Sequence, residues 1–230
     1  MALSREHVLA NLDTIRTEMA SAARRAARSP ESVRLVVAGK TVPAEVVGWV
    51  VEEGVRDVGE NYVRELRSKR DAVLGARWHF IGTLQTSSAH HVAALADVVQ
   101  TLSSERAARR LARRAAEAGR TLDALIEVDF TGERAGLAPD AVAPFADLIA
   151  SLEGLRLAGL MTLPPLPDTP EDARPWFVRL RGLRDGLRDR HPEVVELSMG
   201  MSLDYPVAIE EGATMVRVGT ALFGERTSST

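Results

Sequence analysis

The sequence predicts a closed (β/α)8 barrel, the TIM-barrel fold, with one additional N-terminal helix. Short apolar runs rich in β-branched residues alternate with helical stretches, and eight such runs occur. Strands that alternate with helices imply parallel pairing through right-handed crossovers, and eight units close most naturally into a barrel. A chain of 230 residues suits one such domain, so we expect residues 1–230 to form a single unit. A doubly wound open sheet is the alternative fold.

The expected strands and helices follow one another along the chain. The strands are Arg34–Gly39, Asp57–Gly59, Trp78–Gly82, Asp97–Leu102, Ala124–Asp129, Leu157–Leu163, Val194–Met199 and Met215–Gly219. Between them, proline or a small polar residue opens helical segments, and glycine ends several of them. These segments are 43–53, 61–74, 104–119, one that opens at Pro139, one from 169 to near Pro192, and 204–212.

The two ends of the chain complement each other. After the last strand only ALFGERTSST remains, which is too short for a full eighth helix. Before the first strand, Val8, Leu12, Ile15 and Met19 form an apolar stripe at helical spacing. We therefore expect an N-terminal helix that packs on the outside of the barrel and covers the seam where the barrel closes.

Composition excludes several classes of protein. The net charge of −3 argues against a nucleic-acid partner, and no apolar run approaches the roughly 18–20 residues of a membrane span. The absence of cysteine excludes disulfides, a thiolate nucleophile and cysteine-ligated metal, and it suits a cytoplasmic protein. The adjacent His90 and His91 cannot both face one metal ion from a helix, so we expect no metal site. The arginines of 106–114 indicate a solvated helix face.

Lys40 is the first candidate site residue. In this fold chemistry takes place at the carboxyl ends of the strands, and Lys40 lies at such an end. Period-two alternation places Val36, Ala38 and Lys40 on one face of their strand. A lysine in a partly apolar barrel mouth loses proton affinity, as the amine of a Schiff base requires. A plain surface lysine is the alternative. Lys69, in the polar stretch RSKRD, is the only other lysine.

The last two strands suggest a phosphate site. In MVRVGTALFG, valines and Arg217 alternate, so Arg217 points into the barrel if the valines pack outward. Gly219 and Thr220 then offer amides and a hydroxyl at the rim, and the preceding strand ends in LSMGMS, with Ser198, Gly200 and Ser202. Loops after strands seven and eight commonly bind phosphate in this fold. A ligand with an aldehyde at one end and a phosphate at the other fits both halves, and pyridoxal 5′-phosphate has both groups.

At this point the sequence resembles the pyridoxal phosphate homeostasis proteins, relatives of the alanine racemase barrel (fold type III among pyridoxal phosphate proteins). The resemblance spans nearly the whole chain, through GKTVPAEVV, VGENYVREL, WHFIGTLQ, GLMTLPP and LSMGMSLDYPVAIEEGATMVRVGTALFG. It implies that Lys40 forms the Schiff base, that Asn61 lies near the cofactor, and that Arg217 approaches the pyridine nitrogen. The residues that it implies for the phosphate are Ser198, Met199, Gly200, Met201, Gly219 and Thr220.

The chain departs from the family pattern at three places. Thr86, Ser87 and Ser88 stand where the family usually has an asparagine and a lysine. The loop at 131–138 is shorter than usual and lacks the customary lysine, and Gly39 replaces a common serine. The first two departures argue against any function that depends on secondary lysine sites or on that loop. Neither of the two changes the expected lysine or the phosphate loops.

The same residues indicate the kind of activity. An arginine at the pyridine nitrogen disfavours ring protonation, so the ring is a poor electron sink. Racemisation needs a second proton-transfer group, and we expect Tyr62 and Tyr205 to serve in packing instead. We expect a monomeric, non-catalytic carrier and buffer of pyridoxal phosphate, with pyridoxal-phosphate-dependent apo-enzymes as possible recipients. A racemase or lyase with the same cofactor is the first alternative, and an unrelated sugar-phosphate enzyme is the second.

His79, in WHFIG, allows two interpretations. Alternation along the expected strand directs its imidazole into the barrel. It can form hydrogen bonds within the core, or it can act as a base near the cofactor.

Overall fold

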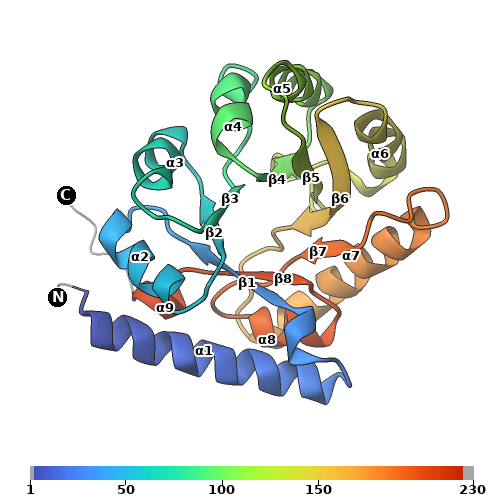
Figure 1. Ribbon diagram of the computed structural model, residues 1–230. Helices are drawn as coiled ribbons and strands as arrows, with labels where there is room; N and C mark the ends of the chain where they lie inside the picture. Colours follow the sequence, from blue (N-terminus) through green and yellow to red (C-terminus); the bar gives the residue numbers. More distant parts are fainter. Residues whose placement is uncertain (1–2, 225–230) are drawn as a thin grey trace.

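The computed structural model describes residues 3–224 and shows a closed barrel of eight parallel strands (Figure 1). The strands are β1 Arg34–Ala38, β2 Asp57–Glu60, β3 Arg77–Phe80, β4 Val98–Leu102, β5 Leu122–Val128, β6 Leu155–Thr162, β7 Glu196–Ser198 and β8 Met215–Val218. Each expected strand is present, with bounds shifted by up to two residues at either end. Because β1 pairs with β8, the open-sheet alternative is wrong.

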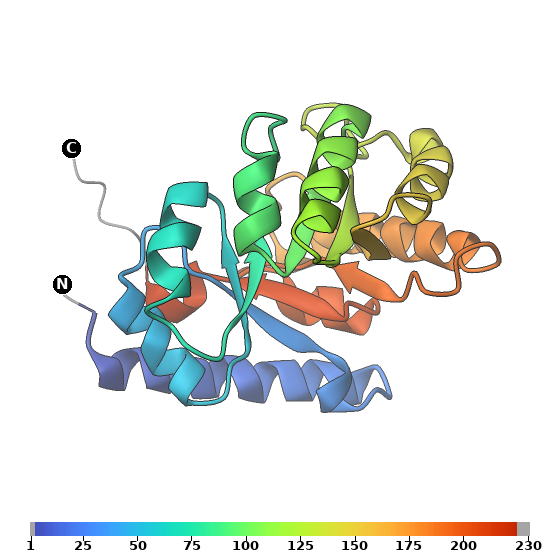
Figure 2. The same cartoon turned by 45° about the horizontal axis from the view of Figure 1, so that its top comes forward.

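Helices surround the barrel, as the turned view in Figure 2 shows. The α-helices are α1 Arg5–Arg25, α2 Ala44–Glu52, α3 Val63–Arg70, α4 Ala89–Leu95, α5 Glu105–Glu117, α6 Val142–Ala150, α7 Arg174–Leu187, α8 Tyr205–Glu210 and α9 Thr220–Phe223. Within residues 3–224, short 3-10 turns precede a strand or a helix at η1 Pro30–Ser32, η2 Pro139–Ala141 and η3 Pro170–Ala173. None of the helices described here is long and apolar enough to cross a membrane.

Some helix boundaries differ from the sequence prediction. The helix α4 was not predicted from the pattern, because its seven residues are too few to show a clear period. The segment expected at 61–74 is helical only at Val63–Arg70. Ser104 precedes α5 in extended conformation as expected of a cap, yet its side chain makes no capping hydrogen bond. The carboxylate of Asp204 accepts from the amide of Met201 instead of capping α8.

Alternation along the strands separates the barrel interior from the outer layer. The interior contains a small apolar cluster of Val36, Val98, Leu125, Ala158, Met161 and Met215. The intervening residues, such as Val37, belong to the larger cluster between strands and helices. The layer of the barrel interior that contains this cluster is therefore apolar. Buried polar side chains fill the rest of the interior.

The helix α1 covers the seam between β1 and β8. Its predicted stripe of Val8, Leu12, Ile15 and Met19 is buried, and the helix packs on α2, α8 and α9 (Figure 1). The Asn11 side chain donates to the carbonyl of Leu222 in α9 at 3.0 Å. Since α9 has only four residues, α1 supplies the apolar cover that a longer eighth helix would provide. The prediction for this helix is confirmed.

The seam can be tested by shortening one side chain of α1. Leu12 is 1% exposed, so Leu12→Ala should lower the free energy of unfolding by about 2–5 kcal/mol through lost burial and a cavity. Leu74, which is 81% exposed, provides the matched control, and Leu74→Ala should change it by less than about 0.5 kcal/mol. Chemical denaturation measures the free energy of unfolding of both variants. Equal effects would show that packing of α1 does not stabilise the seam.

Candidate functional site

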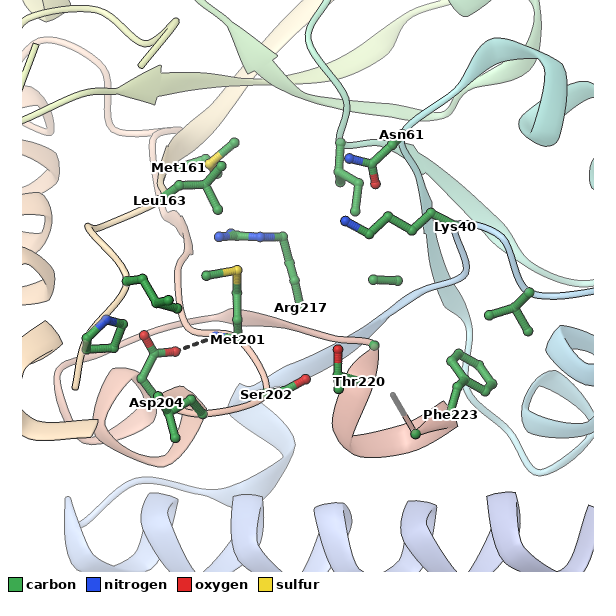
Figure 3. A pocket seen from close by; sticks show the side chains of 18 of the residues that line it. Lys40, Asn61, Met161, Leu163, Met201, Ser202, Asp204, Arg217, Thr220 and Phe223 are labelled. Atoms are coloured by element: carbon green, nitrogen blue, oxygen red, sulfur yellow. Dashed lines mark hydrogen bonds between the residues drawn. The ribbon is translucent and has the colours of Figure 1, made fainter. Parts of the chain in front are cut away.

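A cavity of about 450 Å³ lies where the strands end at the mouth of the barrel. Its wall includes residues at or just beyond the ends of β1, β2, β3, β6, β7 and β8, among them Lys40, Asn61, Arg217 and Thr220 (Figure 3). A cavity of this size suits a small ligand with a few fixed polar contacts. The sequence-predicted Lys40, Asn61, Met201, Arg217, Gly219 and Thr220 all line it.

Lys40 enters the cavity from the turn that follows β1. Figure 3 shows its amine extending from the β1 side towards the guanidinium of Arg217. Ala38, two residues earlier on the same strand face, also lines the cavity, whereas Val36 lies deeper in the barrel interior. The predicted inward face of β1 is therefore confirmed, and it places a primary amine in the cavity.

Arg217 is held at the end of a directed chain of hydrogen bonds that crosses the barrel interior. Arg217 Nη1 donates to Ser198 Oγ at 2.6 Å, and Ser198 Oγ donates to Gln100 Oε1 at 2.6 Å. Gln100 Nε2 lies 2.8 Å from His79 Nδ1, and His79 Nε2 lies 2.7 Å from Asp57 Oδ1. A guanidinium can only donate hydrogen bonds. The donor and the acceptor of each later hydrogen bond in the chain are therefore fixed. The chain ends on the Asp57 carboxylate.

This direction makes His79 neutral, with its proton on Nε2. His79 is fully buried, and burial lowers its pKa although Asp57 opposes that shift. His79 does not line the cavity. Its position supports hydrogen bonding within the core and not the alternative of a base at the site.

The guanidinium of Arg217 is fixed on its other side by the carbonyl of Thr162, to which Nη2 donates at 2.9 Å. Burial lowers the pKa of Arg217 to about 10, and the nearby carboxylates of Asp204 and Glu127 oppose this shift. Arg217 therefore remains a cation and a hydrogen-bond donor at neutral pH. Its two fixed nitrogens give the group one orientation at the cavity.

The loops after β7 and β8 form a single polar rim. Ser202 Oγ accepts from the amide of Ala221 at 3.1 Å and thereby joins the two loops. Gly200 has φ +91°, and a Cβ at this position would lie 2.5 Å from Cβ of Ala208. Glycine is therefore required here for the β7 loop to approach α8. At Gly219 an added Cβ would lie 3.2 Å from the carbonyl oxygen of Ala38, so β8 ends close to β1.

The three remaining predicted residues lie behind this rim. Ser198, Met199 and Gly200 are buried, and none of them lines the cavity. Ser198 contributes to the hydrogen-bond chain, and Met199 packs in the outer core cluster. They shape the loop from beneath, while Met201 and Ser202 face the cavity.

Several cavity residues were not predicted as site residues. Met161 and Leu163 alternate at the end of β6, so the period-two argument used for β1 would have found them. Arg134 lines the cavity from the loop that lacks the family lysine, and no local pattern indicates that position. Asp204 also lines the cavity, and burial raises its pKa while the amide of Met201 opposes the shift.

Neither tyrosine lines the cavity. Tyr62 is 59% exposed, so the packing role expected for it is wrong. Tyr205 is buried, and its hydroxyl donates to the carboxylate of Glu18 on α1. Tyr205 thus links α8 to α1, in agreement with the expected packing role.

The carboxylate of Glu60 lies beneath the Lys40 turn. Glu60 is fully buried at the end of β2, and its Oε1 accepts from Lys69 Nζ at 2.7 Å. Burial raises the pKa of Glu60 to about 7, although the ammonium of Lys69 opposes this shift. Lys69, despite its polar sequence neighbours, is itself only 5% exposed.

Comparison with known proteins identifies relatives over nearly the whole chain. The family described as alanine racemase, N-terminal domain, matches residues 10–227. The chain is 40% identical over 220 residues to the pyridoxal phosphate homeostasis protein of Aquifex aeolicus, with 94% of this chain and 96% of the relative covered. It is 37% identical over 228 residues to the protein of that name from Escherichia coli, with 94% and 95% covered.

Solved structures show the same fold. PipY of Synechococcus elongatus, with pyridoxal phosphate bound, superposes with a TM-score of 0.84 at 31% identity, covering 94% of this chain and 100% of PipY. An alanine racemase of Clostridium difficile gives a TM-score of 0.78 at 17% identity, covering 97% of this chain and 58% of the racemase. The second likeness concerns the barrel fold alone.

Glu60 should make stability depend on pH. Since its pKa rises from 4.5 to about 7 on folding, the folded state keeps a proton that the unfolded state releases between these values. The favourable contribution of protonated Glu60 to the free energy of unfolding is complete below pH 4.5. It is lost as the pH rises through about 7. Glu60→Gln cannot titrate, so its stability relative to wild type should increase by up to about 3 kcal/mol from pH about 5 to 8. Urea unfolding at several pH values measures this difference, and a constant difference would contradict the assignment.

Removing one hydroxyl from the hydrogen-bond chain should cost stability. Ser198→Ala leaves Arg217 Nη1 and Gln100 Oε1 buried without this partner, so unfolding free energy should fall by about 1–3 kcal/mol. Ser151→Ala is the matched control. Ser151 is exposed, and its hydroxyl donates only to a backbone carbonyl at the end of the preceding helix. Thermal unfolding compares the two, and equal transitions would argue against a fixed chain.

Proposed function

The chain belongs to the pyridoxal phosphate homeostasis proteins, within the alanine racemase N-terminal domain family, and from this we propose that it binds pyridoxal 5′-phosphate through Lys40. We further propose that it carries and buffers this cofactor as a single barrel unit, a monomer in the cytoplasm, without robust turnover. The observation that supports binding is one cavity that combines the Lys40 amine, the Arg217 guanidinium and the polar rim of two loops.

The residues present fit this cofactor. When bound, pyridoxal phosphate supplies an aldehyde that condenses with a primary amine, and the aldehyde oxygen leaves as water. Lys40 provides the amine on the β1 side of the cavity, and Met201, Gly219 and Thr220 lie on the rim where a phosphate would be held. In this proposal Ser198, Met199 and Gly200 support that rim, and Asn61 contacts the cofactor from the β2 side.

The surroundings of the cavity favour storage over catalysis. Arg217 is a fixed donor, and a donor at the pyridine nitrogen keeps the ring unprotonated and weak as an electron sink. Racemisation needs a second proton-transfer group, and neither tyrosine lines the cavity. The relatives in Aquifex aeolicus and Escherichia coli carry a name that describes homeostasis and no reaction. Delivery to pyridoxal-phosphate-dependent apo-enzymes is the use that we propose for the bound cofactor.

The attachment site can be tested with the two lysines of the chain, because each serves as a control for the other. The protein is mixed with pyridoxal phosphate, reduced with borohydride, digested and analysed by mass spectrometry. We expect the adduct on Lys40 and not on Lys69, whose amine is buried. Lys40→Ala should abolish the adduct. Retention of the adduct by this variant would refute the proposal.

The absence of robust turnover needs its own assay. The loaded protein is given L- and D-amino acids, and racemisation, transamination and elimination products are measured. We expect turnover far below about 1 s⁻¹, the low end of typical enzymes. A turnover above that value would instead establish the racemase or lyase alternative.

A further inference from the structure

The two peptide groups that bracket Lys40 are both held by side chains of α3. Lys69 Nζ donates to the carbonyl of Gly39 at 2.7 Å, and this carbonyl belongs to the peptide bond that precedes Lys40. Glu65 Oε2 accepts from the amide of Thr41 at 2.6 Å, and this amide belongs to the peptide bond that follows Lys40. Lys69 Nζ also donates to the same Glu65 oxygen, at 3.0 Å. One linked pair therefore fixes the backbone on both sides of Lys40.

Lys69 uses its whole hydrogen-bonding capacity in this arrangement. An ammonium has three donors, and those of Lys69 are directed to Gly39 O, Glu60 Oε1 and Glu65 Oε2. The side chain is only 6% exposed, and an ammonium removed from water is tolerated only with such partners. Lys69 is therefore not a surface lysine, and all three donors of its ammonium are occupied by protein groups.

The backbone at Thr41 shows why a restraint is needed. Thr41 has φ +64°, a left-handed conformation that is unfavourable for a β-branched residue. Such a conformation persists only where the surrounding structure determines it, and it occurs preferentially at functional sites. Two hydrogen bonds hold this turn: the Val42 amide donates to the carbonyl of Gly39 at 2.9 Å, and the Thr41 amide donates to Glu65. Without the hydrogen bond to Glu65 the turn could relax and redirect the Lys40 side chain.

We propose that Lys69 and Glu65 are positioning residues for the Lys40 amine. They act on the backbone and not on the cofactor, since neither lines the cavity. This inference rests on the proposed function, because Lys40 is taken as the attachment point. In this inference Lys69 orients Lys40 and does not itself bind pyridoxal phosphate.

The test must remove the Lys69 ammonium without leaving the Glu60 carboxylate alone in the interior. The variant Glu60→Gln is therefore the reference, and Glu60→Gln with Lys69→Met is the test. Relative to the reference, pyridoxal phosphate should bind about tenfold more weakly at Lys40, the factor expected for one lost hydrogen bond to a charged group. Arg109→Met is the control, because it breaks only the exposed pair of Arg109 and Glu105 and should leave binding unchanged.

A second measurement needs no cofactor. Amide hydrogen exchange at Thr41 reports its hydrogen bond to Glu65, and Glu65→Ala should accelerate exchange there by about tenfold relative to wild type. The same variant should weaken pyridoxal phosphate binding, while amides in the barrel strands keep their protection. If the double variant does not fold, pyridoxal phosphate binding and Thr41 exchange in Glu65→Ala alone test the inference.

The outcomes separate this inference from the proposed function. Labelling of Lys40 in wild type, with binding and Thr41 exchange unchanged in both variants, would overturn the positioning role alone. If wild type carries no label on Lys40, the proposed function fails, and the exchange measurement still decides whether Glu65 restrains the turn. Weaker binding in both variants, with faster exchange at Thr41 and no effect of Arg109→Met, would support the inference.

Discussion

The pairing of β1 with β8 is the interaction on which the rest of the molecule depends. It joins strands from opposite ends of the chain, with Val36 beside Arg217 and Val37 beside Val218. This register places the end of β1, and hence Lys40, next to Gly219 and the β8 loop. Glycine at 219 eases this close approach, because an added Cβ would lie 3.2 Å from the carbonyl oxygen of Ala38. The seam is covered from outside by α1, since α9 is short. The pairing that closes the barrel therefore also brings the β1 and β8 sides of the cavity together.

The interior of the barrel combines apolar packing with a polar chain that is satisfied at every position. The direction imposed by Arg217 passes through Ser198 and Gln100 to His79 and finally to Asp57. Buried polar groups are costly when unpaired, but a fully paired chain orients its members uniquely. The cavity thus receives a guanidinium with a fixed direction and not a mobile cation.

The two lysines of the chain lie in contrasting environments. Lys40 lies in the cavity wall, whereas Lys69 is buried beneath it and bound to two carboxylates and a carbonyl. Burial of Glu60 raises its pKa to about 7, which reflects the free energy required to keep charges beneath the site. This cost arises directly beneath the Lys40 turn, where Thr41 has a left-handed backbone conformation of the kind that persists only when its surroundings determine it.

The sequence by itself determined the barrel, the inward face of β1 and the inward direction of Arg217, because strand alternation is local and has a period of two. It also indicated the covering role of α1 through the stripe at Leu12. Only the tertiary structure decided the burial of Lys69, the place of Ser198 behind the rim, and the presence of Arg134 in the cavity wall. These features depend on contacts between different elements, such as those of Lys69 with the carbonyl of Gly39 and of Ser198 with Gln100. Such contacts leave no periodic signal, because a polar residue looks the same in sequence whether water or a buried carboxylate satisfies it.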